Sequence, residues 1–138
     1  AENLYVWPVS GAVITPFSRD ELVFNKTMGD WRTHPGVDIE TGAGAKVSAI
    51  CAGVVEDIYE DALMGTTVVL SHPGDMRSVY ANLTKVPTIS KGDTVKAGTT
   101  IGAVGGTAAG ETSETHHLHL EVFKGDTPVN PLDYLPGQ

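Results

Sequence analysis

The sequence has little cysteine and no long apolar run. Its 138 residues include a single cysteine, Cys51, which excludes an internal disulfide framework and a zinc cluster built from several cysteines. Cys51 lies in the apolar segment 47–52, and this favours a small buried hydrophobe over a reactive nucleophile. No stretch approaches the roughly 18 apolar residues that a membrane-spanning helix needs, and no signal-like segment is present. Because the chain starts at Ala1 without a Met, we expect it to come from a longer precursor.

Positive charge is also scarce in this sequence. Nine Lys and Arg residues stand against seventeen Asp and Glu residues, which gives a net charge of −8. Nucleic acids and anionic membrane surfaces bind basic stripes, so neither is expected as the main partner. The apolar fraction of 41% is typical of a globular protein, and the length favours one domain over residues 1–138.

Helical periodicity is weak along the chain, and the best helical candidate is the segment 20–31. Sixteen Gly and eight Pro residues imply many turns between short elements. The segment 46–59 holds either two strands or one strand bent at Gly53, and His72-Pro73-Gly74-Asp75 is typical of a hairpin turn. The remaining β-type runs are 13–17, 37–39, 66–71, 77–83, 94–95, 100–104, 118–123 and 128–129. We therefore predict an all-β fold, a small antiparallel sheet, sandwich or barrel.

Histidine positions carry most of the functional information. His34 and Asp38 enclose three residues, and His117 and His119 enclose Leu118. Residues i and i+2 of a β-strand lie on the same face, about 7 Å apart. The imidazoles of His117 and His119 are therefore expected to face one cleft.

Two imidazoles and one carboxylate form a donor set that suits Zn²⁺, and three protein ligands leave a fourth position for water. Spacing alone does not decide for zinc, because a His-x-His pair on a strand is more often a surface or structural feature. The two remaining histidines, His72 in a turn and His116 on the other face of its strand, are expected to have structural roles.

A series of segments, in order along the chain, resembles the LytM/lysostaphin-type zinc endopeptidases, which cut peptide cross-links in the bacterial cell wall. The segments are 7–11, 34–39, 47–49, 53–55, 79–83, 91–95, 101–102 and 117–122. The resemblance covers about residues 7–135 and implies a small antiparallel β-sheet fold with a zinc cleft. It also implies that His34, Asp38 and His119 bind one zinc ion, while His117 flanks the metal and acts in catalysis.

Two features depart from the pattern of the active peptidases. Those enzymes carry a second catalytic histidine in a Tyr-Ala-His-Leu segment, but this sequence has Asn82 at the histidine position. Asparagine neither takes nor gives a proton at relevant pH. The Gly-Pro that usually precedes His-Leu-His is replaced by Thr115-His116, after an enlarged loop at 105–115. We expect this loop to affect the approach of a substrate.

The asparagine and an insertion at about 19–33 resemble a sporulation branch of this family. Members of that branch are anchored in the forespore membrane and meet a mother-cell partner across the intermembrane space. The resemblance implies an extracytoplasmic, zinc-binding domain with a protein partner, weak or no hydrolase activity, and a membrane anchor outside this chain.

Two other interpretations stand beside this one. The first is an active zinc endopeptidase that binds peptidoglycan stem peptides and cleaves their cross-links. The second rests on the segment 91–98, whose pattern is shared with biotinyl and lipoyl carrier domains. Those carriers need a lysine at a hairpin tip between characteristic neighbours, and the sequence offers none.

Overall fold

The computed structural model describes residues 4–15, 17–25, 30–34, 36–42, 44–61, 64–84, 88–105 and 116–136. Apart from the 3₁₀ turn η2, Pro131–Asp133, every element in these ranges is a β-strand, so the all-β prediction is confirmed. No helix in the described ranges is long and apolar enough to cross a membrane. The strands are β1 Ala12–Thr15, β2 Ser18–Asn25, β3 Asp30–His34, β4 Val37–Glu40, β5 Lys46–Ser48, β6 Gly53–Asp61, β7 Gly65–His72, β8 Met76–Leu83, β9 Thr94–Val95, β10 Thr100–Ala103, β11 His117–Lys124 and β12 Thr127–Val129.

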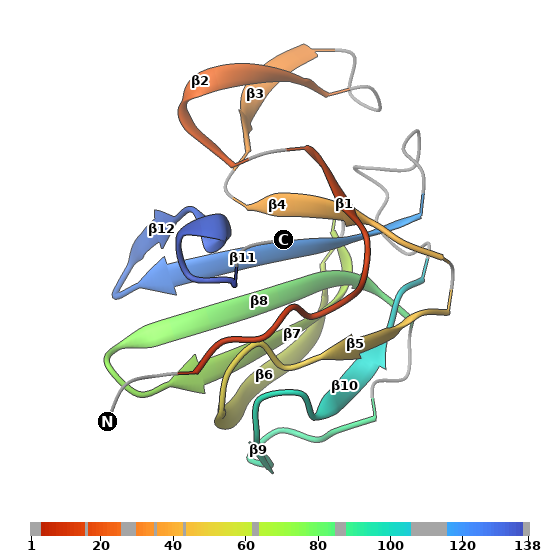
Figure 1. Cartoon of the computed structure of the whole chain (residues 1–138), viewed down its shortest axis with the longest axis vertical. Helices are drawn as coiled ribbons and strands as arrows, with labels where there is room; N and C mark the ends of the chain where they lie inside the picture. The colour runs from red at the N-terminus through yellow and green to blue at the C-terminus, as the bar shows by residue number, and fades with distance from the viewer. Residues whose placement is uncertain are drawn as a thin grey trace.

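One large sheet organises the molecule (Figure 1). Its strands follow the order β1-β4-β11-β8-β7-β6-β9, and β12 adds to β11. Two small sheets, β10-β5 and β2-β3, complete the described strands. Every pairing is antiparallel, as the sequence predicts.

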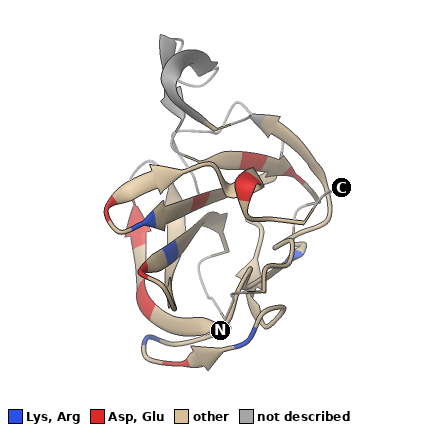
Figure 2. Ribbon diagram, turned by 60° about the vertical axis from the view of Figure 1, so that its left-hand side comes forward, with Lys and Arg blue, Asp and Glu red and all other residues tan. Residues whose placement is uncertain are grey.

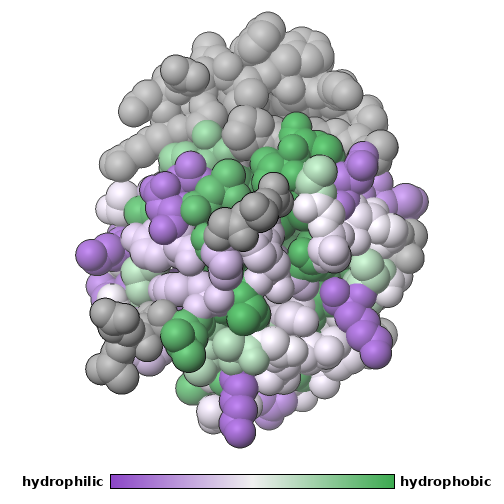
Figure 3. Space-filling model, viewed as in Figure 1, coloured by the Kyte–Doolittle hydropathy of each residue, from purple (hydrophilic) through white to green (hydrophobic). Residues whose placement is uncertain are grey.

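The apolar core lies between one face of the large sheet and the β5-β10 pair. Leu118 and Leu120 of β11 and Tyr80 of β8 are fully buried, as are Val47 of β5 and Ile101 of β10. Because side chains alternate along a strand, the residues between these core positions lie on the opposite face of the sheet. The face seen in Figure 3 carries its described hydrophobic residues in small groups between polar ones.

The predicted hairpin is confirmed between β7 and β8. Strand β7 ends at His72, β8 begins at Met76, and those two residues are paired. Gly74 and Asp75 adopt φ angles of 81° and 62°, the left-handed conformation in which Gly and Asp are favoured at turns. The segment 46–59 is divided into β5 and β6, with β6 beginning at Gly53 as expected.

The helix predicted at 20–31 is wrong, because β2 and β3 pair as antiparallel strands across this segment. The segment contains Val23, Phe24, Thr27 and Trp31, residue types that favour strands. Gly29 near its end weakens a helix, and an isolated helix of about 12 residues is only marginally stable. Local strand propensity and pairing therefore prevailed over a weak helical period.

Buried polar groups connect β7 to the segment that follows β5. His72 Nδ1 donates to the carbonyl of Ala52 at 2.8 Å, and His72 Nε2 lies 2.7 Å from Ser78 Oγ. Ser78 Oγ lies 2.8 Å from Tyr80 Oη, which accepts from the backbone N–H of Ile50 at 3.0 Å. Burial lowers the pKa of His72, so the neutral imidazole is favoured and Nε2 accepts from Ser78. His72 therefore has a structural role, as expected.

The single cysteine is a small buried hydrophobe, as the sequence predicts. Cys51 is 1% exposed and belongs to the hydrophobic core. Burial raises the pKa of its thiol, which disfavours the reactive thiolate.

Candidate functional site

The site begins with the pairing of β4 and β11. Their register places Asp38 directly opposite His119, although the two residues lie 81 positions apart in the sequence. Val37 and Ile39, on either side of Asp38, are fully buried in the core. Alternation along β4 therefore turns Asp38 to the other face of the sheet, where His119 also lies.

Three buried side chains meet on this face. His119 Nδ1 lies 2.7 Å from Asp38 Oδ1, and His117 Nε2 lies 3.9 Å from Asp38 Oδ2. Asp38 is 0% exposed, and His117 and His119 are each 1% exposed. The structure thus brings together three of the residues that the sequence singled out, with Asp38 between the two imidazoles.

Glu121 completes the surroundings of His119 and was not among the predicted residues. Its Oε2 lies 2.8 Å from His119 Nε2, so the imidazole has a carboxylate at each nitrogen. Carboxylates of this kind orient metal-binding histidines and fix which nitrogen faces the metal. A simple signal could have revealed Glu121, because the same-face period of two continues from 117 and 119 to 121.

His34, the remaining predicted ligand, ends β3, and its side chain lies outside the description. Gly36, between β3 and β4, passes close to β11: a Cβ built there would lie 2.2 Å from the carbonyl oxygen of Leu120. Only glycine permits this approach. Within the part of the chain whose side chains are described, no three His, Cys, Asp or Glu residues are placed to hold a metal ion. The predicted set extends beyond that part because it includes His34.

The chemistry of the described donors fits zinc. A carboxylate oxygen of Asp38 and the Nδ1 atom of His119 face each other in a buried setting. Oxygen and imidazole nitrogen are both common zinc ligands, and the contact of Nε2 with Glu121 leaves Nδ1 as the nitrogen on the Asp38 side. These two atoms would therefore supply one oxygen and one nitrogen ligand.

Asn82, near the end of β8, lies beside the same pair of strands. It adopts a φ angle of 64°, is 4% exposed, and donates from Nδ2 to the backbone carbonyl of His117 at 2.8 Å. Its amide thus supports the first residue of β11. An amide has no titratable proton, so this position offers no acid or base.

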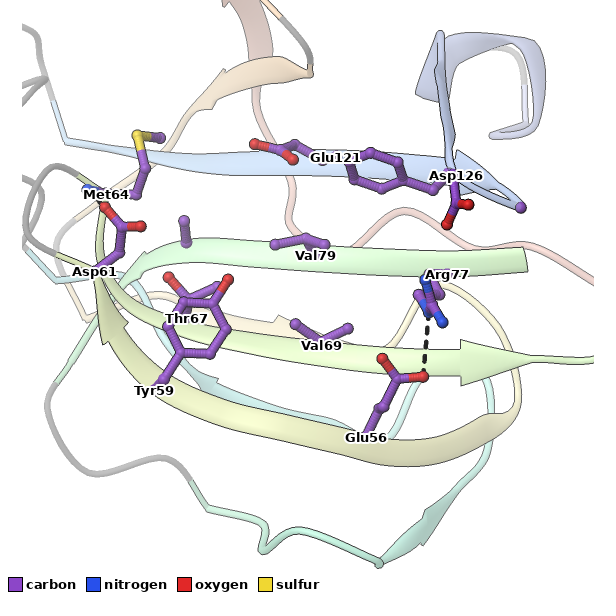
Figure 4. A pocket seen from close by; sticks show the side chains of 13 residues that line it. Glu56, Tyr59, Asp61, Met64, Thr67, Val69, Arg77, Val79, Glu121 and Asp126 are labelled. Carbon is purple, nitrogen blue, oxygen red and sulfur yellow. Dashed lines mark hydrogen bonds and ion pairs between the residues drawn. The ribbon is translucent and has the colours of Figure 1, made fainter. Parts of the chain in front are cut away.

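A groove adjoins these residues on the same face of the sheet (Figure 4). It has a volume of about 400 Å³, and strands β6, β7, β8 and β11 contribute to its lining. Val69, Val79 and Ala81 form an apolar part of the lining, and Glu121 belongs both to the groove and to the surroundings of His119. The groove therefore meets the candidate site at Glu121.

The family model for "Peptidase family M23" matches residues 32–131, a range that contains all the predicted site residues. This range covers more than half of the chain. The chain belongs to peptidase family M23. The resemblance to LytM/lysostaphin-type endopeptidases is thereby confirmed.

Two curated relatives illustrate the range of this M23 domain. An "uncharacterized metalloprotease" of Haemophilus influenzae is 37% identical over 127 residues, which are 91% of this chain and 26% of that protein. Stage II sporulation protein Q of Bacillus subtilis is 31% identical over 102 residues, which are 72% of this chain and 35% of that protein. The chain thus spans about a quarter to a third of these relatives.

Solved structures share the fold of this M23 domain. The structure of the "SpoIIQ-SpoIIIAH pore forming complex" matches with a TM-score of 0.83 and 23% identity, over 98% of this chain and 92% of that one. A "zinc containing peptidase from Vibrio cholerae" matches with a TM-score of 0.73 and 25% identity, over 94% of this chain and 39% of that one.

Two further sequence expectations concern the surroundings of the M23 site. His116 precedes β11, is exposed, and its carbonyl accepts from the backbone N–H of Thr41 at 3.1 Å, a structural contact. The enlarged loop was expected at 105–115. Its residues 106–115 lie outside the described ranges.

Proposed function

We propose that this M23 domain binds one zinc ion through His34, Asp38 and His119. We further propose that it acts mainly as a binding module in an extracytoplasmic protein complex, with weak or no hydrolysis of cell-wall peptides. The observation that carries this proposal is the buried pair of Asp38 and His119, with the amide of Asn82 in place of a second imidazole.

Each residue of the proposed zinc site has a separate role. Zinc held there would polarise a scissile carbonyl and lower the pKa of a water molecule towards neutral pH. Asp38 and His119 would bind the metal, and Glu121 fixes the orientation of the His119 ring. His117 is not one of the proposed metal ligands, and its Nε2 lies on the same face of the sheet as Asp38. Among the described residues, its imidazole is therefore the one that can carry a proton in the reaction.

Weak hydrolysis follows from the residue at position 82. A positioned acid or base contributes about 10²–10⁴-fold to such a reaction. Asn82 supplies none, because an amide has no titratable proton, and one N–H of its amide donates to the carbonyl of His117. The loss affects proton transfer and leaves the metal ligands untouched.

A role in a protein complex is supported by sporulation protein Q and by the edge of the large sheet. Strand β6 pairs with β9 only through Gly53 and Val54, and no described strand lies beside its outer edge at 56–61. An exposed edge strand accepts a strand from another protein. Membrane attachment in such a complex would use a segment outside this chain.

An active zinc endopeptidase is the second candidate function. It is favoured by the groove that meets the site at Glu121 and by the similarity to a metalloprotease. In that case Asn82 would serve as a hydrogen-bond donor to developing negative charge, and stem peptides of the cell wall would be the substrates.

Digestion of purified cell wall separates the two functions. The zinc-loaded wild type, Asn82→His and the matched control Asn82→Gln are compared by release of soluble peptides. Histidine tolerates the φ angle of 64° at this position better than most residues do. We expect little release by the wild type and by Asn82→Gln, and a gain of roughly 10²-fold in Asn82→His. Robust zinc-dependent release by the wild type would instead establish the endopeptidase.

A further inference from the structure

A second pocket lies between the segment that precedes β1 and strand β5, where the two run side by side (Figure 1). The backbone N–H of Ser48 donates to the carbonyl of Pro8 at 2.8 Å. The backbone N–H of Val6 donates to the carbonyl of Ile50, also at 2.8 Å. These two hydrogen bonds fix the walls of the pocket against each other. The pocket has a volume of about 500 Å³, within the range of about 300–1,000 Å³ that is usual for small-molecule sites.

This pocket is separate from the proposed zinc site. Strand β5 packs on the core side of the large sheet, whereas Asp38 and His119 lie on the other face of that sheet. No described residue lines both this pocket and the groove of Figure 4. A ligand in the pocket therefore lies outside the zinc cleft.

Trp7 provides the aromatic wall of the pocket. Its indole Nε1–H donates to the carbonyl of Pro136 at 2.9 Å. The ring packs against the hydrophobic core and remains partly exposed. Because the hydrogen bond engages the one polar atom of the side chain, the ring presents a flat, fixed, apolar surface to the pocket.

Polar side chains reach the pocket from both of its walls. Lys46 and Ser48 lie on either side of the fully buried Val47 in β5, so both are turned away from the core. Ser10 brings a second hydroxyl from the segment before β1. A hydroxyl both donates and accepts hydrogen bonds, whereas a lysine ammonium group only donates. These groups therefore suit a ligand that carries hydroxyls and an anionic group.

Lys46 gives the pocket a charge opposite to the net charge of the chain. Acidic residues outnumber basic ones along the described ribbon (Figure 2), consistent with the net charge of −8. Lys46 is nevertheless the only ionisable side chain among the described residues that line the pocket. It is exposed, and no ion pair within the described part of the chain engages its ammonium group. Its charge is therefore available to an anionic ligand.

We propose that this pocket binds an acidic saccharide, a sugar ring that carries a carboxylate. The C–H face of the sugar packs on the ring of Trp7, because both surfaces are flat and apolar. The sugar hydroxyls exchange hydrogen bonds with Ser10 and Ser48, and the carboxylate pairs with Lys46. A flat aromatic anion would leave both serine hydroxyls unused. Binding here uses no residue of the zinc site, so it goes beyond the proposed function and is independent of it.

The test compares two ligands that differ only in charge. Methyl β-D-glucuronide and the corresponding uronamide are titrated into the isotope-labelled domain at low salt, and the indole N–H resonance of Trp7 is followed by NMR spectroscopy. The chain has one other tryptophan, Trp31, and Trp7→Phe identifies the resonance of Trp7. Lys46→Gln removes the charge and keeps a side chain of similar length. Lys91→Gln is the matched control, because Lys91 is exposed and lies outside the pocket.

The glucuronide is expected to shift the Trp7 resonance in a saturable way and to bind about threefold more tightly than the uronamide. Lys46→Gln should abolish this difference, Lys91→Gln should leave it unchanged, and salt at about 0.5 M should reduce it. No saturable shift, equal affinities of the acid and the amide, or the same loss in both lysine variants would overturn the proposal. Tighter binding of benzoate, which carries its charge on a flat aromatic ring, would overturn it as well.

A further titration distinguishes two sources of the sugar. N-acetylmuramic acid is an acidic sugar of the bacterial cell wall. Tighter binding of N-acetylmuramic acid than of the glucuronide would support the proposal with a cell-wall source. Weaker but saturable binding would support it with another acidic polysaccharide as the source.

Discussion

Replacement of Asn82 tests how the structure holds β8 against β11. Asn82→Ala removes a buried hydrogen bond of 2.8 Å to the carbonyl of His117, a loss of about 1 kcal/mol. It also places alanine at a φ angle of 64°, where its Cβ is strained and its side chain makes no local hydrogen bond as asparagine can. This strain costs about 1 kcal/mol more. We expect the free energy of unfolding to fall by about 2 kcal/mol.

Asn82→Gly separates these two contributions. Glycine loses the same hydrogen bond but adopts a positive φ without steric cost. The glycine variant should therefore be destabilised by about 1 kcal/mol, half the effect of alanine. Urea denaturation at pH 7, followed by tryptophan fluorescence and circular dichroism, measures the loss of unfolding free energy in each variant. The dependence of that free energy on urea concentration should be the same in the wild type and both variants.

Two results would refute this reasoning. Equal destabilisation by alanine and glycine would show that the backbone conformation at position 82 carries no cost. Wild-type stability in both variants would show that the contact between Asn82 and His117 contributes nothing. The second result would also weaken the argument that the Asn82 amide is committed to β11.

Three further predictions concern other positions. The lowered pKa of His72 means that the unfolded chain takes up more protons just below pH 6.5, so the free energy of unfolding should decrease as pH falls below about 6.5. Urea midpoints between pH 5 and 7.5 check this, and a slope unchanged in His72→Gln would remove His72 as its cause. Gly53→Ala places a Cβ 2.1 Å from the carbonyl oxygen of Ser71 and should destabilise the fold by about 1–3 kcal/mol, measured by thermal unfolding; a wild-type melting temperature would contradict it. Glu121→Gln should weaken zinc binding about 10–100-fold in a competition titration with a chelator, and an unaltered affinity would show that Glu121 does not orient His119.

Much of the fold was predictable because its signals are local. The β7-β8 hairpin follows from Gly74 and Asp75, which readily adopt left-handed backbone angles. The direction of the β11 side chains follows from alternation, which sends Leu118 and Leu120 to the core and His119 to the opposite face. The segment 20–31 failed as a helix because its helical period is weak, and antiparallel pairing between the neighbouring strands β2 and β3 prevailed over it.

The site was predictable only in part, for a similar reason. His117 and His119 share a face by local geometry, but the contact of His119 with Asp38 depends on the register of β4 against β11. The hydrogen bond of Asn82 to β11 depends likewise on the register of β8 against β11. Such registers are set by tertiary packing across the sheet. Glu121 lies on a local repeat and could have been found from the sequence.

We propose above that His34, Asp38 and His119 hold a metal ion. The most direct test is the zinc content of the wild-type domain, purified without chelator and measured by mass spectrometry of the metal, with His34→Ala beside it. We expect about one zinc per chain in the wild type and a large loss in His34→Ala, because removal of a ligand weakens binding more than the 10–100-fold typical of outer contacts. A wild-type content below about 0.2 zinc per chain, or equal contents in the two proteins, would contradict it.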